Sequence, residues 1–270
     1  MTASSGSSAS GGGGYQELYE RAEPLVERIN LQQAYGTQDF TSWLMELVRP
    51  QPADAVLDIG CGNGQHLIAL CGGCRQGVGV DLSQELLEAA RRTAETRGLA
   101  HLRFFRMSGD HMDLGDERFE IILCSFALYY MDAPAVIARM RRHVHPTGRI
   151  YVTGSPDENA QELLAIHGRA TSFLPDVYAP GFSDIRKYEP VFAAYFRTRI
   201  FHRFINPLRF PTVDAFMAYY CSTTLFQRSR EAVDGLEQAV ERASREIWEA
   251  QKEIRITKIV ETIELRDPRS

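Results

Sequence analysis

Short apolar runs alternate with amphipathic segments from residue 55 to residue 155. The runs are rich in branched and aromatic residues and predict five strands, at 55–60, 76–81, 102–108, 120–126 and 149–155. The segments between them, such as 83–98 and 133–144, place apolar residues three and four apart and predict helices. Helices that join parallel strands cover both faces of a sheet. The alternation therefore predicts an α/β fold with a mainly parallel sheet.

The pattern before this alternation has two parts. Residues 1–14 are Gly, Ser, Ala and Thr after Met1, too polar and flexible to pack, and predict a disordered tail. Residues 15–50 predict two N-terminal helices, the second with Asp39 or Thr41 as its N-cap.

The regular alternation of predicted strands and helices ends after Ser155. Further helices are predicted at 158–174, 211–226 and 230–253, and two more strands at 197–205 and 254–265. We interpret 156–197 and 207–253 as helical lid and substrate-binding insertions over one sheet. Residues 15–270 are thereby predicted to form a single domain.

Composition narrows the class of protein. A hydrophobic fraction of 44% and a charged fraction of 24% are ordinary globular values. The net charge of −5 argues against nucleic-acid binding, and no apolar run is long enough for a membrane span. Five cysteines without a secretory signal predict a reduced, cytoplasmic compartment. Three lysines among 30 basic residues suggest a GC-rich genome of the kind that carries many specialised-metabolism enzymes.

The strongest chemical signal is the segment 56–64, VLDIGCGNG, where a buried strand runs into a glycine-rich turn and a helix. Gly60 and Gly62 permit close approach of a ligand to the backbone. Asp58 lies two residues before the first glycine, where it repels a pyrophosphate and attracts an ammonium or sulfonium group. The spacing G-x-G-x-G also differs from the dinucleotide pattern G-x-G-x-x-G, so NAD or FAD is the weaker interpretation.

Two further acids end the next two strands. Asp81 follows the turn by about 20 residues, where a carboxylate accepts both ribose hydroxyls, and Leu82 offers an apolar surface to one face of an adenine. Asp110 ends the third strand and is placed to accept from the adenine amine. Each acid alone is equally explained as a solvated loop residue or a helix cap; together, at successive strand ends, the three predict a binding site for a cationic adenosyl ligand.

The segments LDIGCGNG, VDLS, GDHMDL and SFALYYMD together resemble class I S-adenosylmethionine-dependent methyltransferases of the small-molecule type, similar to those of ubiquinone and menaquinone biosynthesis. The resemblance covers roughly 56–155 and implies a Rossmann-like sheet of seven strands, the last antiparallel. It also implies a cofactor site in which Gly60, Cys61 and Gly62 line the methionine part, Asp81 holds the ribose, Asp110 and His111 meet the adenine, and Ser125 and Phe126 lie beside the cofactor.

The sequence signals for the acceptor site are less specific than those for the cofactor site. The cofactor already carries the leaving group, so the protein mainly aligns the two reactants and removes water from them. Tyr129 and Tyr130 occupy a place where relatives often carry histidines, and they are candidate catalytic groups, with core packing as the alternative for at least one. Tyr35, before Gly36, resembles a segment that folds over the cofactor, or forms a structural turn. His167 is a candidate base or a satisfied core histidine.

The insertions are rich in aromatic and basic residues, from which Tyr178, Arg186 and Tyr188 are candidate contacts to an acceptor carrying a carboxylate or phosphate. A solvated basic face is the alternative. No metal-ligand constellation is evident. Cys71 and Cys74 have metal-like spacing, but no second pair accompanies them.

These observations predict methyl transfer from S-adenosylmethionine to a small molecule, with S-adenosylhomocysteine as product, by a monomer or homodimer. Two alternatives stay open. One is a protein that binds S-adenosylmethionine without methyl transfer, such as a cyclase, decarboxylase or regulator. The other is a methyltransferase for RNA or protein, which needs an open basic surface.

Overall fold

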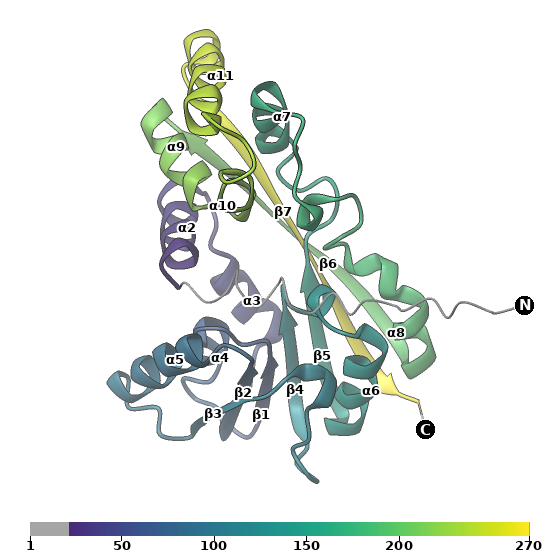
Figure 1. The fold of residues 1–270 in the computed structure, drawn as a ribbon. Coiled ribbons are helices and arrows are strands. Elements are labelled where there is room, and N and C mark those ends of the chain that lie inside the picture. The colour runs from purple at the N-terminus through teal and green to yellow at the C-terminus, as the bar shows by residue number, and fades with distance from the viewer. Residues whose placement is uncertain (1–21, 270) are drawn as a thin grey trace, which may run out of the picture.

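The computed structural model describes residues 22–269 and contains one seven-stranded sheet with the strand order β3-β2-β1-β4-β5-β7-β6 (Figure 1). The strands are β1 (Ala55–Ile59), β2 (Gln76–Asp81), β3 (Leu102–Arg106), β4 (Phe119–Ser125), β5 (Val144–Gly154), β6 (Phe196–Phe210) and β7 (Ile254–Pro268). The predicted tail 1–14 and the start of the first predicted helix lie outside the described residues.

Strands β1 to β5 are parallel, and β7 is antiparallel to both β5 and β6. This confirms the predicted Rossmann-like sheet with its antiparallel last strand. The central strand β1 is buried at every position, since helices cover both of its faces. Its carboxyl end leads directly into the glycine turn, and this puts the turn at the middle of the sheet edge.

Helices pack on both faces of the parallel strands. One face carries α3 (Phe40–Val48), α4 (Gln65–Leu70) and α5 (Gln84–Thr96), whose apolar side chains form a core cluster with Val56, Ile121 and Leu123. The other face carries α6 (Ala133–His143) and α8 (Glu189–Tyr195), which pack on a second cluster around Leu57, Ile59 and Ile122. Successive strand residues point to opposite faces, so each strand contributes to both cores.

A separate helical lobe, here called the cap, stands beyond the carboxyl edge of β5. The register ends β5 at Gly154, opposite Glu261, whereas β6 and β7 continue as a two-stranded ribbon to the pair Phe210 and Ile254. Figure 1 shows this ribbon rising away from β4 and β5 with helices on it. The cap has its own apolar core. Its helices are α2 (Ala22–Tyr35), α7 (Gln161–Ala170), α9 (Val213–Ser222), α10 (Thr224–Ser229) and α11 (Leu236–Gln251).

Helix boundaries follow the expected capping chemistry at two positions. The side chain of Asp39 accepts from the backbone N–H of Ser42 and caps α3, and Ser83 caps α5 by accepting from Leu86. Such caps contribute about 1 kcal/mol each. Asp39 rather than Thr41 is therefore the N-cap of α3.

Several boundaries differ from the sequence expectation. The helix predicted at 158–174 spans only Gln161–Ala170, the helix predicted at 211–226 is divided into α9 and α10, and β5 begins at Val144 rather than at residue 149. The helix predicted at 230–253 begins only at Leu236, because Gly235 adopts a left-handed conformation with φ of 67°. The strand predicted to end at Ile205 runs to Phe210. It passes through Pro207 because β6 is an edge strand, where the missing N–H of proline removes no ladder bond.

Residues 22–269 also contain four short 3₁₀ turns: η2 (Gly109–His111), η3 (Leu128–Tyr130), η4 (Asp176–Tyr178) and η5 (Ile185–Tyr188). In the part of the chain from residue 22 to 269, no helix is long and apolar enough to cross a membrane.

Candidate functional site

The glycine turn after β1 is held against the end of β2. The backbone N–H groups of Gly60 and Cys61 both donate to the carbonyl of Val80, at 2.8 and 3.0 Å. Gly60 has φ of 70°, and a Cβ on it would lie 2.4 Å from Cβ of Ala127, so glycine is required there. Gly62 has φ of 53° but open space around it. The turn therefore leaves room beside Gly62, on the side a ligand would approach.

Asp81 links the turn to the end of β2. Its Oδ2 accepts from the backbone N–H of Gly62 at 2.8 Å, and its Oδ1 accepts from the N–H of Ser83 at 2.8 Å. Burial raises the pKa of Asp81 above its usual value, although both backbone N–H groups act in the opposite direction. Each carboxylate oxygen keeps a second lone pair for hydroxyl donors of a ligand.

Asp58 is the most unusual group in the described part of the chain. Asp58 is 1% exposed at the next-to-last position of β1, and its Oδ1 has no hydrogen-bond partner. Burial, together with the nearby charge of Asp81, raises the pKa of Asp58 to about 8. A buried carboxylate without a counter-charge costs several kcal/mol, so this position strongly favours a cation.

Ser125 supplies a second orphaned oxygen at the same edge. Ser125 lies at the end of β4, the strand next to β1, and its Oγ is buried without a hydrogen-bond partner. Buried polar atoms in proteins are rarely left unpaired, and those that are unpaired often await a ligand. The two orphaned oxygens lie on neighbouring strands next to the glycine turn, and they fit a ligand that carries an ammonium or sulfonium group.

The predicted adenine contacts lie at the ends of β2 and β3. Leu82 is 43% exposed despite being apolar, as expected for a residue that meets a ligand face. Asp110 accepts from the hydroxyl of Ser108 at 2.7 Å and from the backbone N–H of Asp132 at 2.6 Å, which ties η2 to the start of α6. His111 is exposed beside it. Asp110 thus has a structural task, and its contact with adenine stays a prediction.

Phe126, at the cofactor edge, contacts the N-terminal helix α3. It adopts φ of 57°, its N–H donates to Thr153, and its ring meets that of Phe40 at 5.4 Å. Phe40 also contacts the rings of Trp43 and Phe204. The start of α3 therefore closes over the end of β4.

Polar contacts reinforce this closure. Thr41 of α3 accepts from the side chain of Gln65 at 3.0 Å and lies 3.3 Å from Nδ1 of His66, both at the start of α4. Burial lowers the pKa of His66 to about 4, so it is neutral at pH 7. Sequence analysis did not assign Phe40, Thr41 or His66 to the site, because their proximity to it arises only from the docking of α3.

Tyr129 and Tyr130 form an aromatic group with a residue from the first insertion. Their ring centroids are 4.6 Å apart, and each lies within 5.7 Å of the ring of Phe182. The tyrosines lie in η3, shortly after Ser125, so the group adjoins the cofactor edge. It provides aromatic faces and phenol hydroxyls on the acceptor side.

Other predicted residues lie elsewhere. Tyr35 ends α2 and packs on Phe210 in the cap, with ring centroids 5.0 Å apart, and its place over the cofactor stays a prediction. His167 is 2% exposed and bonded at both ring nitrogens, with Nδ1 2.7 Å from the hydroxyl of Tyr220 and Nε2 2.9 Å from the carbonyl of Phe173. Since Nε2 must donate to that carbonyl, Nδ1 accepts from Tyr220. His167 is a satisfied core histidine, and its position gives no support to the predicted role as a base.

The three predicted acceptor contacts are not brought together. Tyr178 packs against the core of the cap, whereas Tyr188 packs against the sheet and Phe192. Arg186 forms ion pairs with three carboxylates, Glu158, Asp184 and Glu261, so its charge is already matched. The predicted anion site at Arg186 is therefore not supported by the structure.

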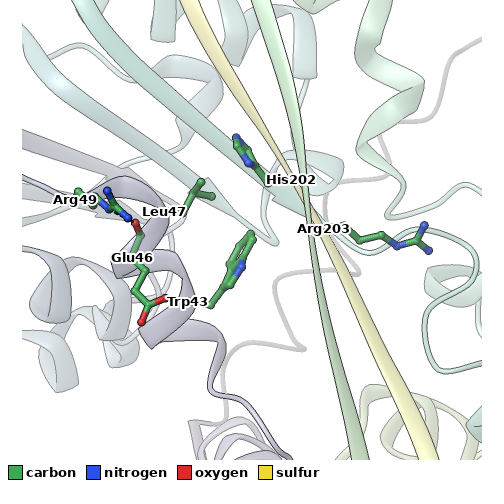
Figure 2. A pocket seen from close by; sticks show the side chains of 6 residues that line it. All are labelled: Trp43, Glu46, Leu47, Arg49, His202 and Arg203. Atoms are coloured by element: carbon green, nitrogen blue, oxygen red, sulfur yellow. Dashed lines mark hydrogen bonds between the residues drawn. The ribbon is translucent and has the colours of Figure 1, made fainter.

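A surface cavity of about 310 Å³ lies between the end of α3 and the middle of β6 (Figure 2). Its lining residues are Trp43, Glu46, Leu47, Arg49, His202 and Arg203. Neither the glycine turn nor any of the three strand-end acids lines it, so it is separate from the cofactor edge.

Comparison with known proteins agrees with the fold and the turn. Residues 56–148 match the model of a methyltransferase domain. Nocamycin O-methyltransferase from Saccharothrix syringae is 33% identical over 51% of this chain and 50% of its own length. Demethylmenaquinone methyltransferase from Bacillus cereus (strain B4264) is 26% identical over 50% of this chain and 62% of its own length. The chain thus matches about half the length of these relatives.

A solved structure extends the likeness beyond the matched segment. The YcgJ protein from Bacillus subtilis superimposes with a TM-score of 0.59 at 17% identity, over 84% of this chain and 97% of that chain. In its sheet, its glycine turn and residues 56–148, the chain is similar to the methyltransferase domains of known proteins. The matched segment contains Asp58, Asp81 and Asp110 and ends before the cap.

Proposed function

We propose that this protein transfers the methyl group of S-adenosylmethionine to a small organic acceptor, in specialised metabolism. The observation that carries the proposal is the pair of orphaned buried oxygens, Asp58 Oδ1 and Ser125 Oγ, on the neighbouring strands β1 and β4 next to the glycine turn. S-adenosylmethionine supplies an electrophilic methyl group on a sulfonium. Its positive charge fits the unmatched carboxylate of Asp58.

The residues of the chain have distinct tasks in this proposal. Asp81 accepts the ribose hydroxyls while its bonds to Gly62 and Ser83 keep the carboxylate in place. Leu82 packs on the adenine, and Asp110 and His111 lie at its edge. Gly60, Cys61 and Gly62 border the methionine part. Methyl transfer is an in-line displacement, so orientation and exclusion of water supply much of the rate.

The acceptor side is formed by the aromatic group of Tyr129, Tyr130 and Phe182 and by the cap. The ribbon of β6 and β7 holds the cap helices beyond the carboxyl edge of the sheet, where a lid would cover the site (Figure 1). Of the insertions predicted at 156–197 and 207–253, we propose that the cap helices, at 161–170 and 213–251, act as this lid. The end of the first insertion, with α8, packs on the sheet, and residues 196–210 belong to β6. Tyrosine faces stabilise the positive charge that develops on an acceptor during transfer, and their hydroxyls orient it.

The test is turnover with methyl-labelled S-adenosylmethionine and a panel of small phenols, acids and amines. Release of S-adenosylhomocysteine together with a labelled product supports the proposal, and Asp81→Ala is the matched inactive control. Tight binding of S-adenosylhomocysteine without turnover on any acceptor would instead indicate a cofactor-binding protein that does not transfer methyl groups. Labelling of RNA or protein from a cell extract, with none of small molecules, would indicate a macromolecular acceptor.

A further inference from the structure

One side chain of the ribbon holds the connector between α2 and α3, residues 36–39. Asn206 on β6 accepts from the backbone N–H groups of Thr37 and Gln38, at 2.9 and 3.2 Å, and its amide donates to the carbonyl of Gln38 at 2.8 Å. Within residues 22–269, these two N–H groups have no other hydrogen-bond partner. The connector therefore depends on a side chain that lies 168 residues beyond Gln38 in the sequence.

The amide of Asn206 fits closely against the connector. Asn206 is 4% exposed, and both its oxygen and its nitrogen are hydrogen-bonded, as buried polar groups in proteins usually are. Gly36 leaves the space that the amide fills, since a Cβ on Gly36 would lie 2.5 Å from Nδ2 and 2.8 Å from Oδ1 of Asn206. Packed atoms do not approach this closely, so a side chain at residue 36 would push the connector away from the amide.

A second contact joins the start of α3 to the same strand. Phe204 lies two residues before Asn206, on the same face of β6, and is 3% exposed. Its ring contacts those of Phe40 and Trp43, with centroids 5.5 Å apart in each case. Asp39 caps α3 between these two points of contact. The connector and the first turn of α3 are thus attached to the ribbon together.

The first turn of α3 touches both walls of the proposed cofactor site. The ring of Phe40 lies 5.4 Å from that of Phe126, which directly follows β4. The same ring lies 5.5 Å from that of His66, and Thr41 accepts from the side chain of Gln65 at 3.0 Å. His66 and Gln65 begin α4, directly after the glycine turn. The first turn of α3 therefore bridges the end of β4 and the glycine turn, and the connector sets its position.

We propose that Asn206 is a positioning residue for the cofactor. It fixes the connector to the ribbon and so keeps the first turn of α3 across the cofactor edge, where this turn slows escape of the bound cofactor. The proposal rests on the proposed cofactor site and adds a residue outside the segment 56–148 that matches a methyltransferase domain. Asn206 bonds to the connector, so it acts through Phe40 and Thr41. A variant without the amide should release the cofactor faster but capture it at nearly the same rate, because the glycine turn and Asp81 are unchanged.

The test measures release of radiolabelled S-adenosylhomocysteine after dilution into an excess of the unlabelled compound. Asn206→Leu replaces the amide by an apolar side chain of similar size, and Gly36→Ala pushes the connector away from an intact Asn206. We expect each variant to raise the dissociation rate constant about fivefold or more, the effect of losing roughly one net hydrogen bond. The association rate constant should change less than the dissociation rate constant. Hydrogen exchange at Thr37 and Gln38 should be faster in both ligand-free variants.

Asn159 provides the matched control, because its Oδ1 accepts from the backbone N–H of Ile259 on the same ribbon at 2.9 Å. Asn159→Leu removes a bond of the same kind from the ribbon without touching the connector, and it should leave both rate constants unchanged. All proteins are compared well below their unfolding midpoints, where a loss of global stability alone does not change the rate of release.

A smaller increase in the dissociation rate constant of Asn206→Leu or Gly36→Ala would overturn the proposal, and so would an equal increase in Asn159→Leu. If Asn206→Leu does not fold, Gly36→Ala decides the question. Wild-type protein that binds no S-adenosylhomocysteine would contradict the proposed function as well as this inference. Wild-type binding with unchanged release in the variants contradicts only the role of Asn206.

Discussion

The carboxylate of Asp81 accepts a 2.8 Å hydrogen bond from the backbone N–H of Gly62. This bond joins the end of β2 to the turn after β1, two segments that are 19 residues apart. Because this side chain fixes the turn, the position of the carboxylate that we propose binds the ribose and the shape of the turn depend on each other.

Replacing Asp81 by alanine should weaken binding of S-adenosylhomocysteine by about 100-fold or more. The change removes acceptors for two ribose hydroxyls, and hydrogen bonds to a charged group contribute about 1.5–3 kcal/mol each. Calorimetry measures the dissociation constant directly. Asp116→Ala, at an exposed position, is the control and should bind normally. Unchanged affinity in Asp81→Ala would remove this residue from the site.

Ligand-free protein should lose stability as the pH rises from about 4 to 8, in part through Asp58. The pKa of Asp58 in the folded chain is about 8, above the value of about 3.9 in an unfolded chain. The folded state therefore binds the proton more tightly, and its stabilising effect, complete below pH 4, disappears as the pH rises through 8. Asp58→Asn should flatten this dependence.

The measurement is the difference in unfolding midpoint between pH 5.5 and 8.5, for the wild type and Asp58→Asn. The same variant should bind S-adenosylmethionine weakly, because the carboxylate that attracts its charge is gone. An identical pH dependence in both proteins would show that Asp58 is not a buried, proton-binding group.

The two glycines of the turn should respond differently to alanine. Gly60→Ala places a methyl group 2.4 Å from Ala127 in addition to the positive φ, so it should destabilise the fold strongly. Gly62→Ala has space and adds only left-handed backbone strain, which costs about 1–3 kcal/mol. Denaturant unfolding should rank Gly60→Ala as the less stable variant. The reverse order would mean that the turn packs differently.

His167→Gln should reduce stability without changing the pH profile of turnover. Both ring nitrogens of His167 are bonded inside the cap, and losing such bonds costs about 1–3 kcal/mol. Chemical unfolding measures the first effect, and kcat against pH measures the second. If stability is unchanged while kcat falls 100-fold, His167 acts in catalysis after all.

Much of the fold was predictable from local patterns in the sequence. Buried apolar runs at β1 to β5 alternate with amphipathic helices, and this alternation is typical of a parallel sheet covered on both faces. Asp39 and Ser83 have side chains that cap helix N-termini. The start of α11 at Leu236 was not predicted. Gly235 delays this start through a left-handed backbone conformation, which the periodic pattern of apolar residues does not reveal. The extension of β6 through Pro207 depended on its place at the sheet edge.

The sequence by itself determined the cofactor half of the site. Asp58, Gly60, Gly62 and Asp81 lie within one strand–turn–helix–strand unit, where short connections bring strand ends to one edge. Only the tertiary structure decided the acceptor half. The docking of α3 brings Phe40 onto Phe126, and Phe182 of the first insertion meets Tyr129 and Tyr130 across more than 50 residues of chain. Contacts between such distant segments depend on how helices and strands pack, and a residue's own neighbours in the sequence carry no record of that packing.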